Sequence, residues 1–186
     1  MTMTPLLILL GAVLCSQSVS AEVLPPADFN IQGTVGRWYL VGIASNSEWF
    51  TSRRATMKMG RAMLKLTADG DLEMSYESLR SDGTCLKKNK LAKKTGVPGK
   101  FTYTCQRSGR MIDMRVAELK ADEYMLIHTI KTKEEGTSTV TKLYGRAEEL
   151  AAPVKEKFKQ LALRTGSLAE NIVFLPKNGT FCLRFC

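Results

Sequence analysis

The stretch from Met111 to Gly145, MIDMRVAELKADEYMLIHTIKTKEEGTSTVTKLYG, decides the fold. In its first part, Ile112, Met114 and Val116 alternate with polar residues, which is the period-two pattern of a strand with one apolar face. Turn residues at 134–136 separate two further β-rich runs. The stretch therefore predicts three sequential strands, at residues 111–119, 123–131 and 137–144.

The same pattern continues upstream and changes downstream. Five more short β-rich runs, separated by Gly, Asp and Pro turns, cover residues 37–44, 55–67, 71–79, 84–93 and 100–105. An eight-stranded up-and-down antiparallel sheet of this kind closes into a barrel that holds one small ligand. The helical spacing of Leu150, Val154, Phe158 and Leu161 predicts an amphipathic helix over 153–165, packed outside the barrel. A short ninth strand is expected at 172–175, so the fold class is all-β.

The N-terminus predicts a secretory signal peptide over residues 1–21. An apolar core through Val13 is followed by the small-residue cleavage site Val19-Ser20-Ala21, so Glu22 begins the expected mature chain. Removing Cys15 leaves four cysteines, and their even number fits an oxidising compartment. Three pairings among them are possible: the four are Cys85, Cys105, Cys182 and Cys186.

Length and charge narrow the class of protein. The chain has 186 residues, 44% of them apolar, which predicts one folded domain over residues 22–186. No later apolar run is long enough to cross a membrane. The net charge of +9 fits polyanions or small carboxylate ligands, but no motif resembles a nucleic-acid-binding module. We expect a monomer that binds no nucleic acid.

The basic residues form two groups. The group that follows the first strand would make a cationic rim able to capture a carboxylate, and consists of Arg53, Arg54, Lys58 and Arg61. The second group consists of Lys87, Lys88, Lys90, Lys93 and Lys94. It is interpreted as a solvated strand edge, and weak polyanion binding is the minor alternative.

Other chemistry is sparse. His128 is the only histidine, so neither a catalytic triad nor a multi-histidine metal site is predicted, and no cofactor motif is present. His128 follows Leu126 on an apolar strand and is expected to be a hydrogen-bonded interior residue, with a ligand contact as the alternative. Asn178-Gly179-Thr180 is a possible glycosylation triplet.

Three motifs resemble the conserved regions of the lipocalin family, in the family's order. They are Asp28-Phe29-Asn30 with Gly36-Arg37-Trp38-Tyr39, then Asp122-Glu123-Tyr124, then Leu143-Tyr144-Gly145-Arg146. The resemblance implies a secreted carrier of a small hydrophobic ligand such as a retinoid, a fatty acid or a prostanoid. Residues 44–49 and 171–176 resemble the prostaglandin D synthase branch, whereas residues 141–147 resemble the α1-microglobulin branch.

The resemblance also assigns individual roles. It implies that Arg146 stacks on Trp38 as a structural pair, that Trp49 lies at the barrel mouth, and that Cys85 pairs with Cys182. Together with the cationic rim and with apolar residues of the predicted strands, Trp49 completes the set of expected ligand contacts. These are Trp49, Arg53, Arg54, Lys58, Met59, Met114, Leu126 and His128.

Enzyme activity is put in doubt by the missing thiol. The catalytic cysteine of the synthase branch is replaced by Gly60 and its supporting serine by Leu40, while the reactive cysteine of the α1-microglobulin branch is replaced by Ser47. No catalytic residue is therefore predicted, and Gly60→Cys is expected to restore a trace of synthase activity. Two alternatives stay open, an isomerase of altered mechanism and a scavenger of haem or bile pigments.

Overall fold

The computed structural model describes residues 22–105, 109–133 and 136–178. The predicted leader and both Cys182 and Cys186 lie outside these residues. The elements, in chain order, are η1 (Ile31–Thr34), β1 (Gly36–Ala44), α1 (Glu48–Thr51), η2 (Arg54–Thr56), β2 (Arg61–Leu66), β3 (Leu72–Leu79), β4 (Cys85–Lys94), β5 (Lys100–Thr104), β6 (Met111–Lys120), β7 (Tyr124–Lys133), β8 (Gly136–Gly145), α2 (Ala152–Arg164), η3 (Ala169–Asn171) and β9 (Ile172–Phe174).

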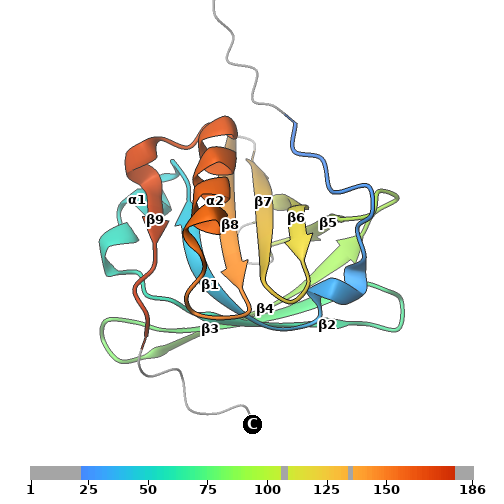
Figure 1. Ribbon diagram of the computed structural model, residues 1–186, viewed down its shortest axis with the longest axis horizontal. Helices are drawn as coiled ribbons and strands as arrows, with labels where there is room; N and C mark the ends of the chain where they lie inside the picture. The colour runs from blue at the N-terminus through green and yellow to red at the C-terminus, as the bar shows by residue number, and fades with distance from the viewer. Residues whose placement is uncertain (1–21, 106–108, 134–135, 179–186) are drawn as a thin grey trace, which may run out of the picture.

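The strands form one closed antiparallel barrel. Each strand from β2 to β8 pairs with the next, β8 pairs with β1, and β1 also pairs with β2, which closes an eight-stranded ring. The short strand β9 adds to the outside of β1, and helix α2 packs against β1 and β8. Figure 1 shows α2 lying across the outer wall of the barrel. The predicted eight-stranded up-and-down barrel, with an outer helix and a ninth strand, is confirmed.

The helix docks where the barrel wall has no side chain. Its buried face is Val154, Phe158, Leu161 and Ala162. Phe158 lies directly over Gly42 of β1, where an added Cβ would come within 2.8 Å of the ring. A glycine at this position therefore allows the helix to approach the strand closely.

The main boundary difference lies before β2. The sequence predicted a strand over 55–67, but β2 begins at Arg61. Residues 54–56 form the 3-10 turn η2, and residues 57–60 continue as a loop. Helix α1 was not expected, because a four-residue helix is too short to show a helical period.

Trp38 and Arg146 close one end of the barrel. Trp38 is fully buried, and its indole Nε1 donates a hydrogen bond to the Thr34 carbonyl at 2.7 Å. The Arg146 guanidinium lies 3.6 Å from the centre of the Trp38 ring. It also donates to four backbone carbonyls, those of Gly33, Val35, Arg37 and Ala121. The stacking expected for this pair is present, and it fastens η1 and the β6–β7 turn across the barrel end.

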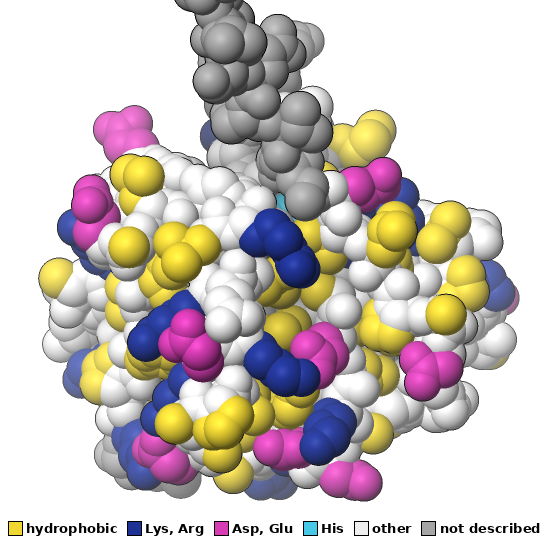
Figure 2. Space-filling model, turned by 45° about the horizontal axis from the view of Figure 1, so that its top comes forward, with side chains coloured by type: hydrophobic (Ala, Val, Ile, Leu, Met, Phe, Trp, Pro, Cys, Tyr) yellow, Lys and Arg dark blue, Asp and Glu magenta, His cyan; other side chains and the backbone are white. Residues whose placement is uncertain are grey.

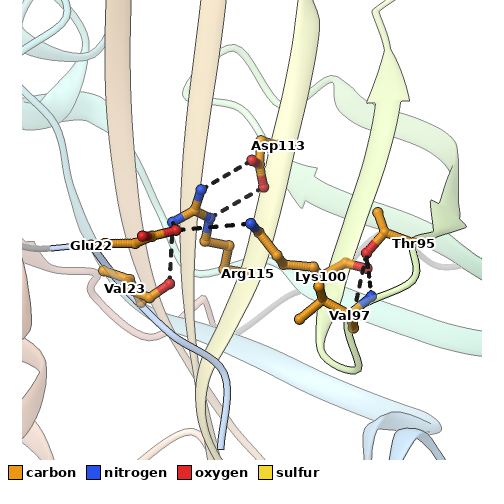
Figure 3. Close-up of polar contacts among 7 residues, drawn as sticks. All are labelled: Glu22, Val23, Thr95, Val97, Lys100, Asp113 and Arg115. Atoms are coloured by element: carbon orange, nitrogen blue, oxygen red, sulfur yellow. Dashed lines mark hydrogen bonds and ion pairs between the residues drawn. The ribbon is translucent and has the colours of Figure 1, made fainter.

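The residues that follow the predicted cleavage site are held against the outer wall (Figure 3). Arg115 of β6 donates to the Glu22 carboxylate at 3.1 Å and to the Val23 carbonyl at 3.2 Å. Its guanidinium also pairs with Asp113 at 3.2 Å. Because Arg115 is buried, these three acceptors satisfy a charge that would otherwise be costly. The start of the expected mature chain is thus anchored to the barrel.

Candidate functional site

The barrel encloses a cavity of about 570 Å³. This volume lies within the usual range for a small-molecule pocket. Apolar side chains from several strands line it, among them Leu40, Leu64, Met74, Met114, Met125 and Ile127. These residues face inward because alternate side chains of a strand point to opposite faces of the sheet.

Three lysines project into this apolar space from the barrel walls. Lys88 and Lys90 come from β4, and Lys142 comes from β8. Three further cationic residues line the cavity from the loops between strands: Arg53, Lys58 and Arg80. Among the described residues that line the cavity, none is Asp or Glu. The cavity is therefore strongly positive and lacks internal compensation from the residues that line it.

The lysines affect one another electrostatically. Burial, followed by repulsion from Lys90, lowers the pKa of Lys142 to about 8. Burial and repulsion from Lys142 likewise lower the pKa of Lys131 to about 8. Burial also opposes the charge of Lys90, but its neighbour Tyr103 raises the Lys90 pKa overall. An anion bound between these ammonium groups would reduce their mutual repulsion, so the partly dry cavity favours anion binding.

Tyr103 and Tyr144 supply hydroxyl groups beside the lysines. Lys90 Nζ donates to the Tyr103 hydroxyl at 3.0 Å. Burial raises the pKa of Tyr144 to about 12, so its phenol stays protonated at neutral pH. Both tyrosines line the cavity. Phenol groups can therefore add hydrogen bonds to an anionic group held by the lysines.

Trp49 lies at the cavity wall on the short helix α1. Its neighbour Phe50 is fully buried and packs edge-on against the Trp49 ring, with centroids 5.9 Å apart. Lys131 Nζ lies 4.7 Å from the centre of the same ring. The Trp49 Nε1 is buried and has no hydrogen-bond partner among the described residues. This donor is therefore available to a ligand.

Four of the eight predicted ligand contacts line the cavity. They are Trp49, Arg53, Lys58 and Met114. The other four, Arg54, Met59, Leu126 and His128, are not among the residues that line it. Contact of the first four residues with a ligand stays a proposal.

His128 and Leu126 face away from the cavity. On β7 the inward residues are Met125, Ile127 and Thr129, so alternation turns Leu126 and His128 toward the outside. His128 Nδ1 lies 3.1 Å from Thr141 Oγ1, which in turn lies 3.1 Å from Thr165 Oγ1 beyond the end of α2. His128 is thus buried and hydrogen-bonded, as expected of an interior residue, but it does not line the cavity as a ligand contact would. Its role in the structure is to join β7, β8 and the end of α2.

Arg54 and Met59 also have structural surroundings. The Arg54 guanidinium donates to the Glu170 carbonyl at 2.8 Å and to the Asn171 side chain. It thereby joins η2 to η3. Met59 is 1% exposed and belongs to the core, and its amide donates to the Pro176 carbonyl at 3.1 Å. Both residues hold the mouth loop against the C-terminal segment.

The sequence interpretation of the β4 lysines requires correction. β4 pairs with β3 over Cys85–Ala92 but with β5 only at Lys93 and Lys94, so the correction concerns the direction of Lys88 and Lys90 and not the strand edge. Lys88 and Lys90 share the inward face with Leu86. The sequence does contain a sign of this inward direction. Alternate residues of a strand share one face, and the face that carries Lys88 and Lys90 has an apolar residue at each end, Leu86 and Ala92. Apolar residues at both ends of a face indicate that this face, with its two lysines, turns inward.

Tyr76 fills the space beside Gly60. A Cβ built on Gly60 would meet the Tyr76 hydroxyl and would lie 2.6 Å from the Glu77 backbone oxygen. No ordinary side chain fits there without movement of β3. The position that carries the thiol in the synthase branch is therefore closed by a neighbouring strand as well as lacking the sulfur atom.

Two further expectations concern the C-terminal segment. The Asn178 side chain is 5% exposed, and its Nδ2 is buried without a hydrogen-bond partner among the described residues. Thr180 of the triplet lies outside the described residues, so glycosylation at Asn178 stays a prediction. Cys182 lies outside the described residues, so its pairing with Cys85 stays a prediction.

The surface has a mixed character. On the face turned to the viewer in Figure 2, Lys and Arg side chains lie beside Asp, Glu and apolar side chains and do not form one continuous basic area. This face gives no support to polyanion binding. Of the helices that the structure describes, none has the length and apolarity required to span a membrane.

Comparisons with known proteins agree with this geometry. The model of the lipocalin / cytosolic fatty-acid binding protein family matches residues 35–179. A protein of Rhinella marina named lipocalin is 38% identical over 159 residues, covering 86% of each chain. Prostaglandin-H2 D-isomerase of Canis lupus familiaris is 34% identical over 173 residues, covering 92% of this chain and 90% of its own.

A solved structure is also similar. It is described as "The Siderocalin Ex-FABP functions through dual ligand specificities", with a TM-score of 0.69 and 26% identity. The match covers 80% of this chain and 97% of the solved one. The similarity thus extends over nearly the whole of that barrel.

Proposed function

Because the chain belongs to the lipocalin / cytosolic fatty-acid binding protein family, we propose that it is a secreted, monomeric carrier of a small hydrophobic ligand with an anionic group. The ligand class is that of a retinoid, a fatty acid or a prostanoid carboxylate. Secretion is supported by the leader pattern of residues 1–21 and by the even number of cysteines that remain after it.

One observation carries the proposal. The cavity is lined by apolar side chains and by Lys88, Lys90 and Lys142, with no carboxylate among its described lining residues. Apolar walls accept a hydrocarbon body, and ammonium groups accept a carboxylate through charge-assisted hydrogen bonds. A purely neutral ligand would leave the lysines uncompensated in a partly dry space.

A fluorescence titration tests the carrier function. Retinoic acid should quench the Trp49 emission with a saturable one-to-one curve, and Trp49→Phe should remove most of this quenching. Retinol should bind about tenfold or more weakly, because it lacks the charged hydrogen bonds. Equal binding of the acid and the alcohol would contradict the anionic preference. No saturable binding of retinoids, fatty acids or bilirubin would reject the carrier function.

An isomerase is the second candidate, since several relatives bear the name prostaglandin-H2 D-isomerase. Gly60 lacks a thiol, and Cys105 at the end of β5 is the cysteine that would have to replace it. Conversion of the endoperoxide in the presence of glutathione should stay at background for the wild type. Turnover that Cys105→Ser abolishes would support the isomerase and contradict the carrier as the main function.

A further inference from the structure

The lysines converge from opposite walls of the barrel. In a ring of eight strands, β4 and β8 are four strands apart in either direction, so Lys88 and Lys90 face Lys142 across the cavity. Their repulsion is direct, since Lys90 and Lys88 both lower the Lys142 pKa, although burial lowers it most. The positive charge thus comes from two opposite strands of the barrel and not from the loops at its mouth alone.

These ammonium groups retain free hydrogen-bonding capacity. Each has three donors, and Lys90 uses one of them on the Tyr103 hydroxyl. The Lys142 side chain has no hydrogen-bond or ion-pair partner among the described residues. Three charges with most of their donors available are more than one carboxylate can neutralise.

We propose that the cavity selects ligands whose head group carries two negative charges close together on an apolar chain. This inference rests on the proposed carrier function, and it replaces the single carboxylate of the proposed ligands with a head group of two charges as the preferred one. The two charges lie between β4 and β8, where Lys90 and Lys142 each contact one anionic oxygen. The apolar chain lies against Leu64, Met74 and Met125. Lys88, the most exposed of the three, contributes attraction at longer range.

Calorimetric titration with matched probes tests this selection. The probes are dodecylmalonate, which has two carboxylates on one carbon, tetradecanoate, which has one, and 1-tetradecanol, which has none. At pH 7.4 the dianion should bind about tenfold or more tightly than the monoanion, because each charged hydrogen bond adds a factor of this order. The alcohol should bind most weakly.

Variants separate the cavity from overall charge. Lys142→Met should reduce the preference for the dianion to within about threefold, and Lys142→Arg should restore part of it. Lys65→Met is the matched control, because it removes the same charge from an exposed position outside this cavity and should keep the preference. If Lys142→Met fails to fold, Lys90→Met provides the same test at the other lysine that contacts the head group.

The outcomes distinguish the two proposals. Equal affinity for dodecylmalonate and tetradecanoate would overturn the two-charge head group and leave the carrier function standing. The same loss of preference in Lys142→Met and Lys65→Met would also overturn it, since general electrostatic attraction would then explain the data. Absence of binding by both acids would overturn the proposed function together with the inference.

Discussion

The Tyr76 hydroxyl occupies the space into which a side chain at Gly60 would extend. The Glu77 backbone oxygen bounds the same space, so β3 closes it with both a side chain and the main chain. Restoring the missing cysteine alone therefore does not restore the site.

Gly60→Cys should destabilise the protein by about 1–3 kcal/mol, the usual cost of overpacking. We expect no gain of synthase activity, which revises the sequence-based expectation of a trace. Gly96→Cys is the matched control, because a Cβ at Gly96 meets no atom within 4 Å. Denaturant unfolding checks both variants, and a cycle with Tyr76→Ala should show a smaller cost for the cysteine. A stable and active Gly60→Cys variant would refute this account.

Anion binding should weaken as the pH rises from 7 to 9. The Lys142 pKa of about 8 means that its ammonium is mostly charged at pH 7 and mostly neutral at pH 9 in the free protein. A bound carboxylate favours the charged form, so binding takes up a proton near pH 8. Affinity for retinoic acid should fall about tenfold across this range. Lys142→Met should show a flatter profile, and an unchanged slope in that variant would contradict the assignment.

His128 should make the folded protein sensitive to mild acid. Burial, followed by repulsion from Arg115, lowers its pKa to about 4, against 6.5 when exposed. Its contribution to stability is complete above pH 6.5 and is lost as the pH falls toward 4, since only the unfolded chain takes up the proton. Between pH 7 and 5 the loss is about 2 kcal/mol. Glutamine does not titrate, so the free energy of unfolding of His128→Gln should fall less over this interval. Denaturant unfolding at several pH values makes the comparison, and an equal fall in the wild type and the variant would contradict the assignment.

Arg146→Ala should lower the free energy of unfolding by about 2–4 kcal/mol. The change removes the stacking on Trp38 and leaves four backbone carbonyls without their guanidinium donor. Arg164→Ala, an exposed position at the end of α2, should change stability by less than about 0.5 kcal/mol. Thermal unfolding of both variants makes the comparison, and equal midpoints would show that the pair is dispensable.

Peptide mapping under non-reducing conditions should recover Cys85 joined to Cys182. Such a bridge would close a loop of nearly one hundred residues and contribute about 4 kcal/mol in the chain-entropy model. Recovery of Cys85 joined to Cys105 would show that the family pairing does not apply to this chain. Reduction should lower the unfolding midpoint without changing the anion preference.

Much of this protein follows from local sequence. The alternation of Ile112, Met114 and Val116 and the turns between short strands are enough to predict an up-and-down barrel, because strand faces and hairpins are local properties. The helical spacing that includes Val154 and Phe158 predicted the outer helix almost to its ends. The place of α1 was not predictable, since four residues carry no period of their own.

Which residues line the cavity depends on which face of each strand turns inward, and the sequence did not predict this for every strand. Local pattern counted Leu126 and His128 as ligand contacts and interpreted Lys88 and Lys90 as solvated. The closed barrel instead turns the first two away from the cavity and the two lysines toward it. Lys90 and Lys142 lie far apart in sequence and face each other only because β4 and β8 become opposite walls when β1 pairs with β2. The sequence alone was enough to predict the barrel. Only the tertiary structure showed the cationic cavity, because the lysines that line it come from strands far apart in the sequence, which lie opposite each other only after the barrel closes.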